Sequence, residues 1–349
     1  MVFKNSKLNT KYSHIVDIKS VKDNIFGISK NVSIRLTNKE NAYGRTIKVL
    51  IPHFRQEIPL FILFRALNIE SDKEIIQHIV YDLEDDEMSN ILLASLEESS
   101  SIQTQQLAQE YMIKYIYMSN YHLKDTDKHK KLVYLNEVIK NELLPHVGDC
   151  YQKKACFIGH MTNRLLQCFL GRMDYDDRDS YINKRIDLPG KLLEDLFRQY
   201  YKKLISECRK TFKKRMGHSK TDDDPVNIIN SIKSNIIEQG LKAALLTGSW
   251  GNKKKGVAQR LERLTYLNTI VSLRRVNSPT VDASTNKLTS PRHLHSSQVG
   301  FICPVETPEG AKVGLVNHLS MIGNITIPSD PNIVIDYLEE NCNLIKLQD

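Results

Sequence analysis

The stretch Ser290–Met321 combines charged side chains with residues that constrain the backbone. Its two carboxylates are Glu306 and Glu309, and the constraining residues are Pro304, Pro308, Gly310 and Gly314. Proline fixes φ at about −65° and glycine adopts conformations that other residues avoid, so this pattern predicts a shaped loop. A rigid loop that presents charges can build a site. The alternative is a structural turn whose glutamates are solvated or cap a helix beginning near Gly310.

The same part of the chain carries most of the positive charge. From Gly248 to Met321 there are ten Lys or Arg residues against four Asp or Glu, a net +6 of the total +8. Localised basic charge attracts phosphate backbones and releases counterions on binding, although a merely solvated basic face has the same composition. GSWGNKKKG (248–256) lacks the G-K-[ST] ending of a P-loop, which argues against nucleotide binding of that type.

Metal-binding patterns are weak throughout the sequence. The acidic cluster Asp174–Asp179 could suit a hard cation, but it contains Arg178 and is followed by Lys184 and Arg185, so we expect an ion-paired junction. The six cysteines are scattered without a CxxC pair, which is typical of reduced thiols. We therefore predict no metal site and no catalytic residue in this chain.

Composition limits the class of protein. The 349 residues, 41% of them hydrophobic, suffice for two or three domains. No apolar run reaches the roughly 18 to 20 residues of a membrane helix, and the N-terminus has no apolar core of a signal peptide. We expect an intracellular protein without a membrane contact.

Hydrophobic periodicity predicts an α+β fold. Alternation over Asn31–Thr37 and Thr46–Ile51 indicates a β-hairpin, and a helix is expected to begin near Pro59. Helical spacing continues over the stretch from Asp72 to Leu144. The further helices are expected at 155–170, from Pro189 to about 212, at 226–246 and at 257–273, with a polar loop at 277–289.

The sequence of several segments resembles that of a known family. PRHLHSSQVGFICPVETPEGAKVGLVNHLS is similar to the fork region of the second-largest (β-like) subunit of multisubunit DNA-directed RNA polymerases. GSWGNKKKGVAQRLERLTYLNTIVSLRRVNSP, DYDDRDSYINKRIDLPGKLLEDLFRQ and KYSHIVDIKSV extend the resemblance over nearly the whole chain. The resemblance is closer to nuclear-type and large-DNA-virus polymerases than to bacterial ones. The resemblance implies an incomplete multidomain subunit with a mixed lobe domain, a helical return to a protrusion, and a fork of helices and loops.

The resemblance also implies a division of the chain. Residues 1–27 correspond to the end of a protrusion-like segment and 28–185 to the lobe. Residues 186–248 correspond to protrusion return helices, 249–325 to the fork, and 326–349 to the start of an external domain. The family's later parts would follow, so we expect a segment of a split, intron- or intein-interrupted, or truncated gene.

Functional residues follow from the same resemblance. Gln259 and Arg275 correspond to positions near the RNA, where an amide and a guanidinium suit phosphate and sugar oxygens. Glu309 corresponds to the active-centre wall, where we expect it to orient neighbouring basic groups. The nucleic-acid-binding residues expected in all are Lys253, Lys254, Lys255, Gln259, Arg260, Arg274, Arg275 and Arg292.

The implied activity is template-directed RNA synthesis by an assembled enzyme in which this chain alone is inactive. The expected partners are DNA, the RNA–DNA hybrid, the largest subunit and the remainder of the second-largest subunit. No cofactor is expected in this chain, because Mg²⁺ would be held by the largest subunit. The location would be the nucleus, or the cytoplasm or virion for a viral protein. The alternative is a non-catalytic residual or decoy fragment that binds nucleic acid or polymerase subunits.

Overall fold

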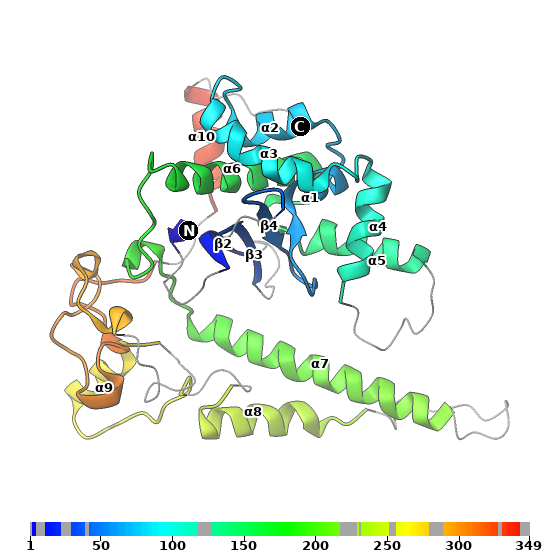
Figure 1. The fold of residues 1–349 in the computed structure, drawn as a ribbon. Helices are drawn as coiled ribbons and strands as arrows, with labels where there is room; N and C mark the ends of the chain where they lie inside the picture. Colours follow the sequence, from blue (N-terminus) through cyan, green and yellow to red (C-terminus); the bar gives the residue numbers. More distant parts are fainter. Residues whose placement is uncertain are drawn as a thin grey trace. The chain divides into compact units, whose positions relative to one another are not determined.

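The described residues form two compact units (Figure 1). The computed structural model describes residues 2–4, 11–21, 29–38, 42–117, 128–216, 229, 232–250, 256–278, 289–326 and 330–342. The first unit comprises Met1–Arg178 and Asp187–Asp195, and the second comprises Asp179–Ile186 and Leu196–Asp349. Helices together with antiparallel sheets confirm the predicted α+β class. None of the helices in these ranges has the length and apolarity needed to cross a membrane.

A five-stranded antiparallel sheet organises the first unit, with its strands in chain order. The strands are β1 (Val2–Lys4), β2 (Tyr12–Ser20), β3 (Lys30–Thr37), β4 (Ile47–Leu50) and β5 (Ile58–Pro59). The predicted hairpin is confirmed by the pairing of β3 with β4, in which Ile34 lies opposite Val49. The register continues this row to Val16 on β2 and Ile58 on β5, and all four side chains are buried. Alternation thus turns one face of the sheet into the core.

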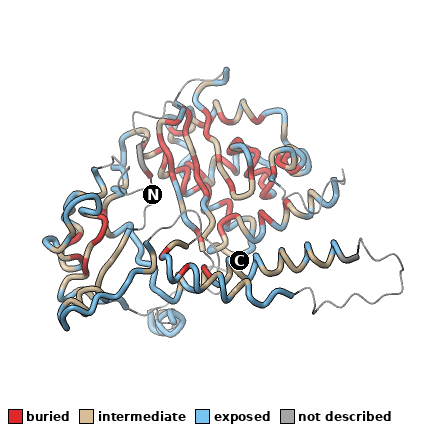
Figure 2. The backbone as a smooth tube through the Cα atoms, turned by 90° about the horizontal axis from the view of Figure 1, so that it is seen from below, coloured by how far each residue is buried: buried red, intermediate tan, exposed pale blue. Residues whose placement is uncertain are grey.

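Among the described residues, the helices of the first unit besides the start of α7 are α1 (Leu60–Ala66), α2 (Asp72–Val80), α3 (Asp86–Ser99), α4 (Gln105–Tyr115), α5 (Lys128–Asn141) and α6 (Tyr151–Phe169). Pro59 predicted the start of α1 and periodicity predicted the others, although α6 begins four residues before the expected Ala155. In Figure 1, α1, α2, α3 and α6 lie on one side of the strands. Figure 2 shows the buried residues of this unit on the strands and the inner faces of the helices.

Two buried basic side chains, Arg65 and Lys154, donate hydrogen bonds to carbonyl oxygens at the carboxyl ends of helices. Arg65 of α1 donates to the carbonyl oxygens of Ser99 (2.7 Å) and Ile102 and pairs with Asp72 at 2.6 Å. Lys154 of α6 is fully buried, and its Nζ donates to the carbonyl oxygens of Ile139 (2.7 Å) and Lys140 (2.6 Å), in the last turn of α5. Positive charge at the carboxyl end of a helix is favourable because the last carbonyls have no partner within the helix.

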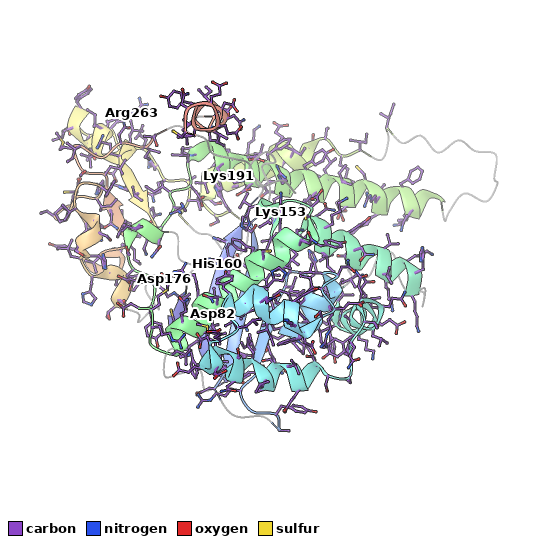
Figure 3. The ribbon with its side chains drawn as sticks, turned by 90° about the horizontal axis from the view of Figure 1, so that it is seen from above. Asp82, Lys153, His160, Asp176, Lys191 and Arg263 are labelled. Atoms are coloured by element: carbon purple, nitrogen blue, oxygen red, sulfur yellow. The ribbon has the colours of Figure 1, made fainter. Side chains whose placement is uncertain are left out.

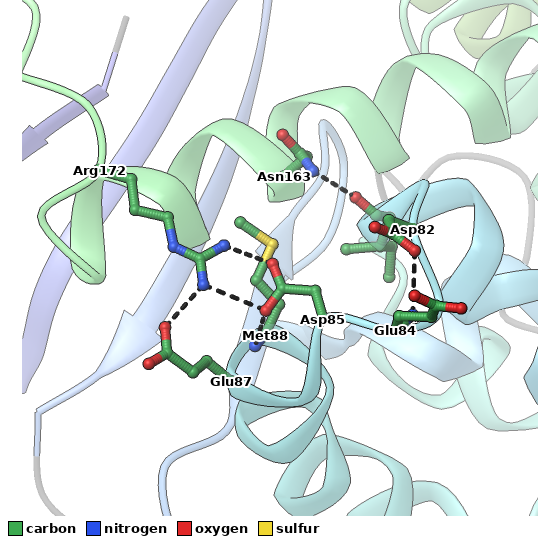
Figure 4. A network of polar contacts seen from close by, with 8 residues as sticks. Asp82, Glu84, Asp85, Glu87, Met88, Asn163 and Arg172 are labelled. Carbon is green, nitrogen blue, oxygen red and sulfur yellow. Dashed lines mark hydrogen bonds and ion pairs between the residues drawn. The ribbon is translucent and has the colours of Figure 1, made fainter.

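Arg172 holds two carboxylates at the start of α3. Arg172 binds Asp85 and Glu87 at the start of α3, while Asp85 also accepts a hydrogen bond from the backbone N–H of Met88 (Figure 4). The hydrogen bond from Arg172 lowers the pKa of Asp85. Because the bound carboxylates raise the pKa of Arg172, its guanidinium stays charged.

The acidic cluster at 174–179 is ion-paired into the fold, as expected of a junction. Asp176, labelled in Figure 3, pairs with Arg164 of α6 at 3.1 Å and accepts from the backbone N–H of Val2 at 2.8 Å. Arg185 donates to the backbone carbonyls of Ile182 and Lys184. No group of three or more His, Cys, Asp or Glu residues in the described ranges is placed to hold a metal ion.

The second unit contains α7 (Pro189–Met216) from Leu196 onward, together with α8 (Asn235–Thr247), α9 (Tyr266–Leu273), α10 (Asn332–Asn341) and the strands β6 (Arg275–Asn277) and β7 (Val316–His318). The long helix after Pro189 is confirmed. It packs against α8 through Gly240, where an added Cβ would lie 2.3 Å from the ring of Tyr200.

The predicted helix 257–273 was too long. The helix begins at Tyr266, because the side chain of Thr265 accepts a hydrogen bond from the backbone N–H of Asn268 and caps it there. Residues 257–264 form no regular element.

Three other predicted boundaries of the second unit were wrong. The helix expected from Val226 begins at Asn235, since Ile232 and Lys233 are not helical; residues 226–228, 230 and 231 lie outside the described ranges. The helix expected near Gly310 is a single 3₁₀ turn, Gly310–Lys312. The loop expected from Asn277 begins after that residue, which ends β6; its residues 279–288 lie outside the described ranges.

Candidate nucleic-acid interface

The β6–β7 ladder positions the central residues of the fork segment. Arg275 lies opposite His318, Val276 opposite Asn317, and Asn277 opposite Val316. This pairing connects the end of α9 to the loop that contains Glu306 and Glu309. A hydrogen bond from Cys303 N–H to the His318 carbonyl and a β-bridge between Ile302 and Leu319 extend this pairing.

Arg275 sits between an amide and an imidazole. Its Nη1 donates to Gln259 Oε1 at 3.2 Å, and its Nε lies 3.4 Å from His318 Nε2. Gln259 is exposed and Arg275 is half-buried. The structure thus brings together the two residues that the sequence placed near the same RNA.

The imidazole of His318 is buried and has a defined partner on each nitrogen. A guanidinium can only donate, so Nε2 must accept the hydrogen bond from Arg275. The hydrogen of the neutral ring then lies on Nδ1, which is 3.2 Å from the carbonyl oxygen of Glu306 and 3.6 Å from its carboxylate. His318 therefore links Arg275 to the turn that carries the two glutamates.

Hydrogen bonds hold together the two ends of the segment Gly248–Val257, which contains the three consecutive lysines. Val257 N–H donates to the carbonyl oxygen of Gly248 at 3.0 Å, and both Gln259 and Asn277 donate through their side-chain amides to the carbonyl oxygen of Gly256. Gly256 has φ +73°, in the region that favours glycine. These bonds fix the backbone at Gly256 and Val257, just before Gln259.

The turn around Glu306 and Glu309 is held by Thr307 and Arg292. Thr307 Oγ1 donates to the Val316 carbonyl and accepts from Gly314 N–H, each at 3.0 Å. Arg292 Nη1 donates to the carbonyl oxygens of Ala311 (2.7 Å) and Val313 (3.0 Å). Gly314 has φ +70°, and a Cβ there would lie 2.3 Å from the Arg292 carbonyl oxygen. The proline- and glycine-rich stretch is a shaped loop, as predicted.

The side chain of Arg274 also binds backbone carbonyl groups. It ends α9, and its Nη2 donates to the carbonyl oxygens of Ser320 and Gly323. Its own backbone carbonyl accepts from Leu319 N–H at 3.1 Å. Arg274 therefore fixes the chain that follows β7.

The segment Asp179–Ile186 packs against the fork, and this contact was missed by the sequence reasoning. Tyr181 N–H donates to Ser297 Oγ at 2.8 Å, Asn317 Nδ2 donates to the Tyr181 hydroxyl at 3.2 Å, and Asp179 accepts from Ser290. Burial raises the pKa of Tyr181, so its hydroxyl keeps its proton at neutral pH. No signal in the sequence indicated this pairing.

The candidate binding residues differ in what their side chains do. Arg260 and Gln259 are exposed, whereas Arg274, Arg275 and Arg292 are half-buried and donate to groups of the fork. Lys253, Lys254 and Lys255 lie outside the described residues.

That Glu309 orients neighbouring basic groups stays a prediction. Its side chain is exposed, does not cap the turn at Gly310, and makes no ion pair within the described part of the chain. Glu306, three residues earlier, is the carboxylate that lies beside a potentially basic ring, that of His318.

Charge is divided unevenly between the two units. The first unit has 25 Lys or Arg against 26 Asp or Glu, whereas the second has 24 against 15, a net +9. The entire positive excess of the chain belongs to the unit that contains the fork. This distribution suits a polyanionic partner for the second unit.

Comparison with known proteins identifies the family. Residues 13–187 match the family described as RNA polymerase Rpb2, domain 2, and residues 259–325 match RNA polymerase Rpb2, domain 3. The chain belongs to the Rpb2 family of second-largest RNA polymerase subunits. Most of the five-stranded sheet with helices α1 to α6, and the Gln259–Arg275–His318 group, lie within these two matches.

Relatives in the Rpb2 family come from several kinds of source. The chain is 39% identical to DNA-directed RNA polymerase II subunit 2 of Arabidopsis thaliana, over 97% of this chain and 28% of that protein. It is 40% identical to DNA-directed RNA polymerase subunit 2 of Acanthamoeba polyphaga mimivirus, over 83% and 26%. Identity to subunit Rpo2N of Methanococcus vannielii is 32%, over 95% and 63%. The chain thus spans less than a third of the plant and viral relatives.

Proposed function

We propose that this chain is a central section of a second-largest RNA polymerase subunit and supports template-directed RNA synthesis within an assembled enzyme. Residues 28–185 would act as the lobe, 186–248 as protrusion helices and 249–325 as the fork, with 1–27 and 326–349 joining neighbouring domains. The observation that carries the proposal is the contact between Gln259 and Arg275 in a sequence segment that matches Rpb2 domain 3.

Each fork residue would have a distinct role. Gln259, Arg260 and Arg275 would contact phosphate and sugar oxygens of the RNA–DNA hybrid, which positions the nucleic acid without reading its sequence. Arg274 and Arg292 would act indirectly, because their guanidinium groups already hold backbone carbonyls. Lys253, Lys254 and Lys255 would add phosphate contacts, and Glu309 would face the active centre.

The chemistry of nucleotide addition would come from outside this chain. Two magnesium ions, held by the largest subunit, would stabilise the attacking and leaving oxygens. The described residues of this chain contain no cluster of ligands suited to such a site. Its partners would be DNA, the hybrid, the largest subunit and the rest of the second-largest subunit, in the nucleus or in a viral compartment.

The test is recovery of this chain in an active polymerase. The native enzyme would be purified from the source organism through template-dependent RNA synthesis and analysed by mass spectrometry. Peptides from Met1–Asp349 in stoichiometric amounts support the proposal, whether they come from a short chain or a longer one. Activity that fractionates without these peptides contradicts it and favours a non-catalytic fragment.

A further inference from the structure

Helices α2 and α6 of the first unit pack against each other at close range. Gly159 of α6 permits this approach, since an added Cβ there would lie 2.2 Å from the backbone carbonyl oxygen of His78. Asn163, one turn further along α6, is buried and donates from its side-chain amide to the carbonyl oxygen of Ile79 at 2.8 Å. The last turn of α2 is therefore fixed on α6.

A thiol and an imidazole meet where these two helices touch. The Sγ atom of Cys156 on α6 lies 3.5 Å from Nδ1 of His78 on α2 and is hydrogen-bonded to it. Cys156 is exposed and His78 is half-buried, so a small molecule in solution can reach the sulfur. A cysteine in contact with a potential base is the arrangement that converts a thiol into the nucleophilic thiolate.

A second pair lies one turn along on both helices. The hydroxyl of Tyr81 is 3.2 Å from Nδ1 of His160, which Figure 3 labels on α6. Burial, and to a smaller extent the charge of Cys156, raise the pKa of Tyr81, so its hydroxyl keeps its proton at neutral pH. Because His160 is engaged by Tyr81, it provides a matched imidazole that does not contact the thiol.

We propose that Cys156 is a modification site whose thiol, activated by His78, forms mixed disulfides with small disulfides of the oxidised-glutathione class. In the tautomer with its hydrogen on Nε2, the imidazole accepts the thiol proton at Nδ1. The Cys156 thiolate then attacks one sulfur of the small disulfide, and the new S–S bond forms as the old one breaks. The sulfur that leaves takes the proton back from His78.

The atoms and electrons of this exchange balance. Cys156 is oxidised to the mixed disulfide, and the other half of the small disulfide is reduced to a free thiol. An excess of a reducing thiol reverses the modification. The reaction needs no metal and no other co-reactant.

Cys150 provides a demanding comparison on the same helix. It is exposed at the N-cap of α6, and its thiol makes no hydrogen bond within the described part of the chain. The positive end of the helix dipole favours a thiolate there, so a faster reaction at Cys156 cannot be attributed to the helix. The exposed Lys153 stands between the two cysteines in the sequence and could attract an anionic disulfide to either.

The experiment treats the reduced full chain with oxidised glutathione at pH 7 and follows each cysteine by mass spectrometry. Cys156 should react at least about fivefold faster than Cys150. His78→Gln should slow Cys156 about tenfold and leave Cys150 unchanged, because the contacting base is lost. His160→Gln is the control and should change the Cys156 rate by less than about twofold. Circular dichroism and urea denaturation check that both variants are folded.

A second measurement uses iodoacetamide, a neutral reagent, on the unaltered chain. The preference for Cys156 over Cys150 should persist, since it depends on His78 and not on attraction of an anion by Lys153. Equal rates at the two cysteines, an unchanged Cys156 rate in His78→Gln, or an equal loss in both histidine variants would each overturn the proposal. So would a preference seen with oxidised glutathione alone. None of these readouts depends on assembly into a polymerase, so this proposal can fail independently of the proposed function.

Discussion

Arg275 and His318 face each other across the β6–β7 ladder, 43 residues apart in the sequence, with 3.4 Å between Nε of one and Nε2 of the other. The imidazole is buried and fixed on its far side by Glu306. The direction of the Arg275 side chain is thus set by a residue that itself need not touch nucleic acid.

The first prediction concerns this pair. Replacing His318 with Ala should weaken binding of the chain to an RNA–DNA hybrid about threefold to tenfold, because Arg275 loses one of its two orienting contacts. Adding His318→Ala to Arg275→Ala should change affinity little further. Anisotropy with a labelled hybrid gives both values, and His293→Ala, an exposed histidine of the same unit, is the control. Additive losses would mean that His318 acts independently of Arg275.

A second prediction compares two glycines of the constrained loop. Both have positive φ, but a Cβ at Gly314 would collide with Arg292, whereas one at Gly310 would meet nothing within 4 Å. Gly310→Ala should cost about 1 kcal/mol of stability through backbone strain, and Gly314→Ala at least about 3 kcal/mol because steric overlap is added. Amide hydrogen exchange in β6 and β7 reports the difference. Similar exchange rates in the two variants would disprove the steric argument.

A third prediction links pH to the stability of the first unit. Burial acts to raise the pKa of Glu57, but hydrogen bonds from Tyr12 and Arg35 outweigh it and lower the pKa below its usual 4.5. This stabilisation is therefore complete above the unfolded pKa and is lost as the pH falls through the lower folded pKa. Glu57→Gln should lower the free energy of unfolding by about 2 kcal/mol at pH 7, with a difference that shrinks below about pH 4.5.

Urea denaturation at several pH values tests the role of Glu57. Glu110→Gln, which removes an exposed carboxylate from α4, is the control and should show little effect at either end of the range. A deficit in Glu57→Gln that persists unchanged to pH 3 would show that packing, rather than charge, explains it.

The fourth prediction concerns the buried lysine. Lys154→Met keeps most of the volume but leaves the Ile139 and Lys140 carbonyls without their charged donor. The free energy of unfolding should fall by about 2 kcal/mol. The neighbouring Lys153→Met, at an exposed position, should change it by less than about 0.5 kcal/mol. If both variants are equally stable in urea, the capping of α5 by Lys154 contributes nothing.

The sequence predicted the parts of the fold that depend on burial at regular spacing. The hairpin of β3 and β4 and the helices from α2 to α7 have apolar residues repeating at two or 3.6 residues, and this pattern can be recognised in the sequence alone. The β6 and β7 strands have three residues each, too few for alternation to be recognised. The start of α9 was missed because its signal is one capping threonine, Thr265.

Pairings across the fold were less accessible. The resemblance placed Gln259 and Arg275 near one RNA, and the structure adds that they touch. Nothing in the spacing indicated that Tyr181 would meet Ser297 and Asn317, or that Arg274 and Arg292 would be occupied by carbonyl groups. Such contacts arise from tertiary packing. From residue type alone, Arg274 and Arg292 were expected to bind nucleic acid, whereas in the structure they hold backbone carbonyls.

The hydrogen bond from Val257 to Gly248 has a consequence for how this surface can evolve. A loop closed at its base by its own backbone can gain or lose residues at little entropic cost, since closure entropy grows only slowly with length. The number of lysines between Gly248 and Val257 can then change by insertion or deletion without disturbing α8 or the β6–β7 ladder. Relatives that share this framework can therefore differ in the charge of this loop.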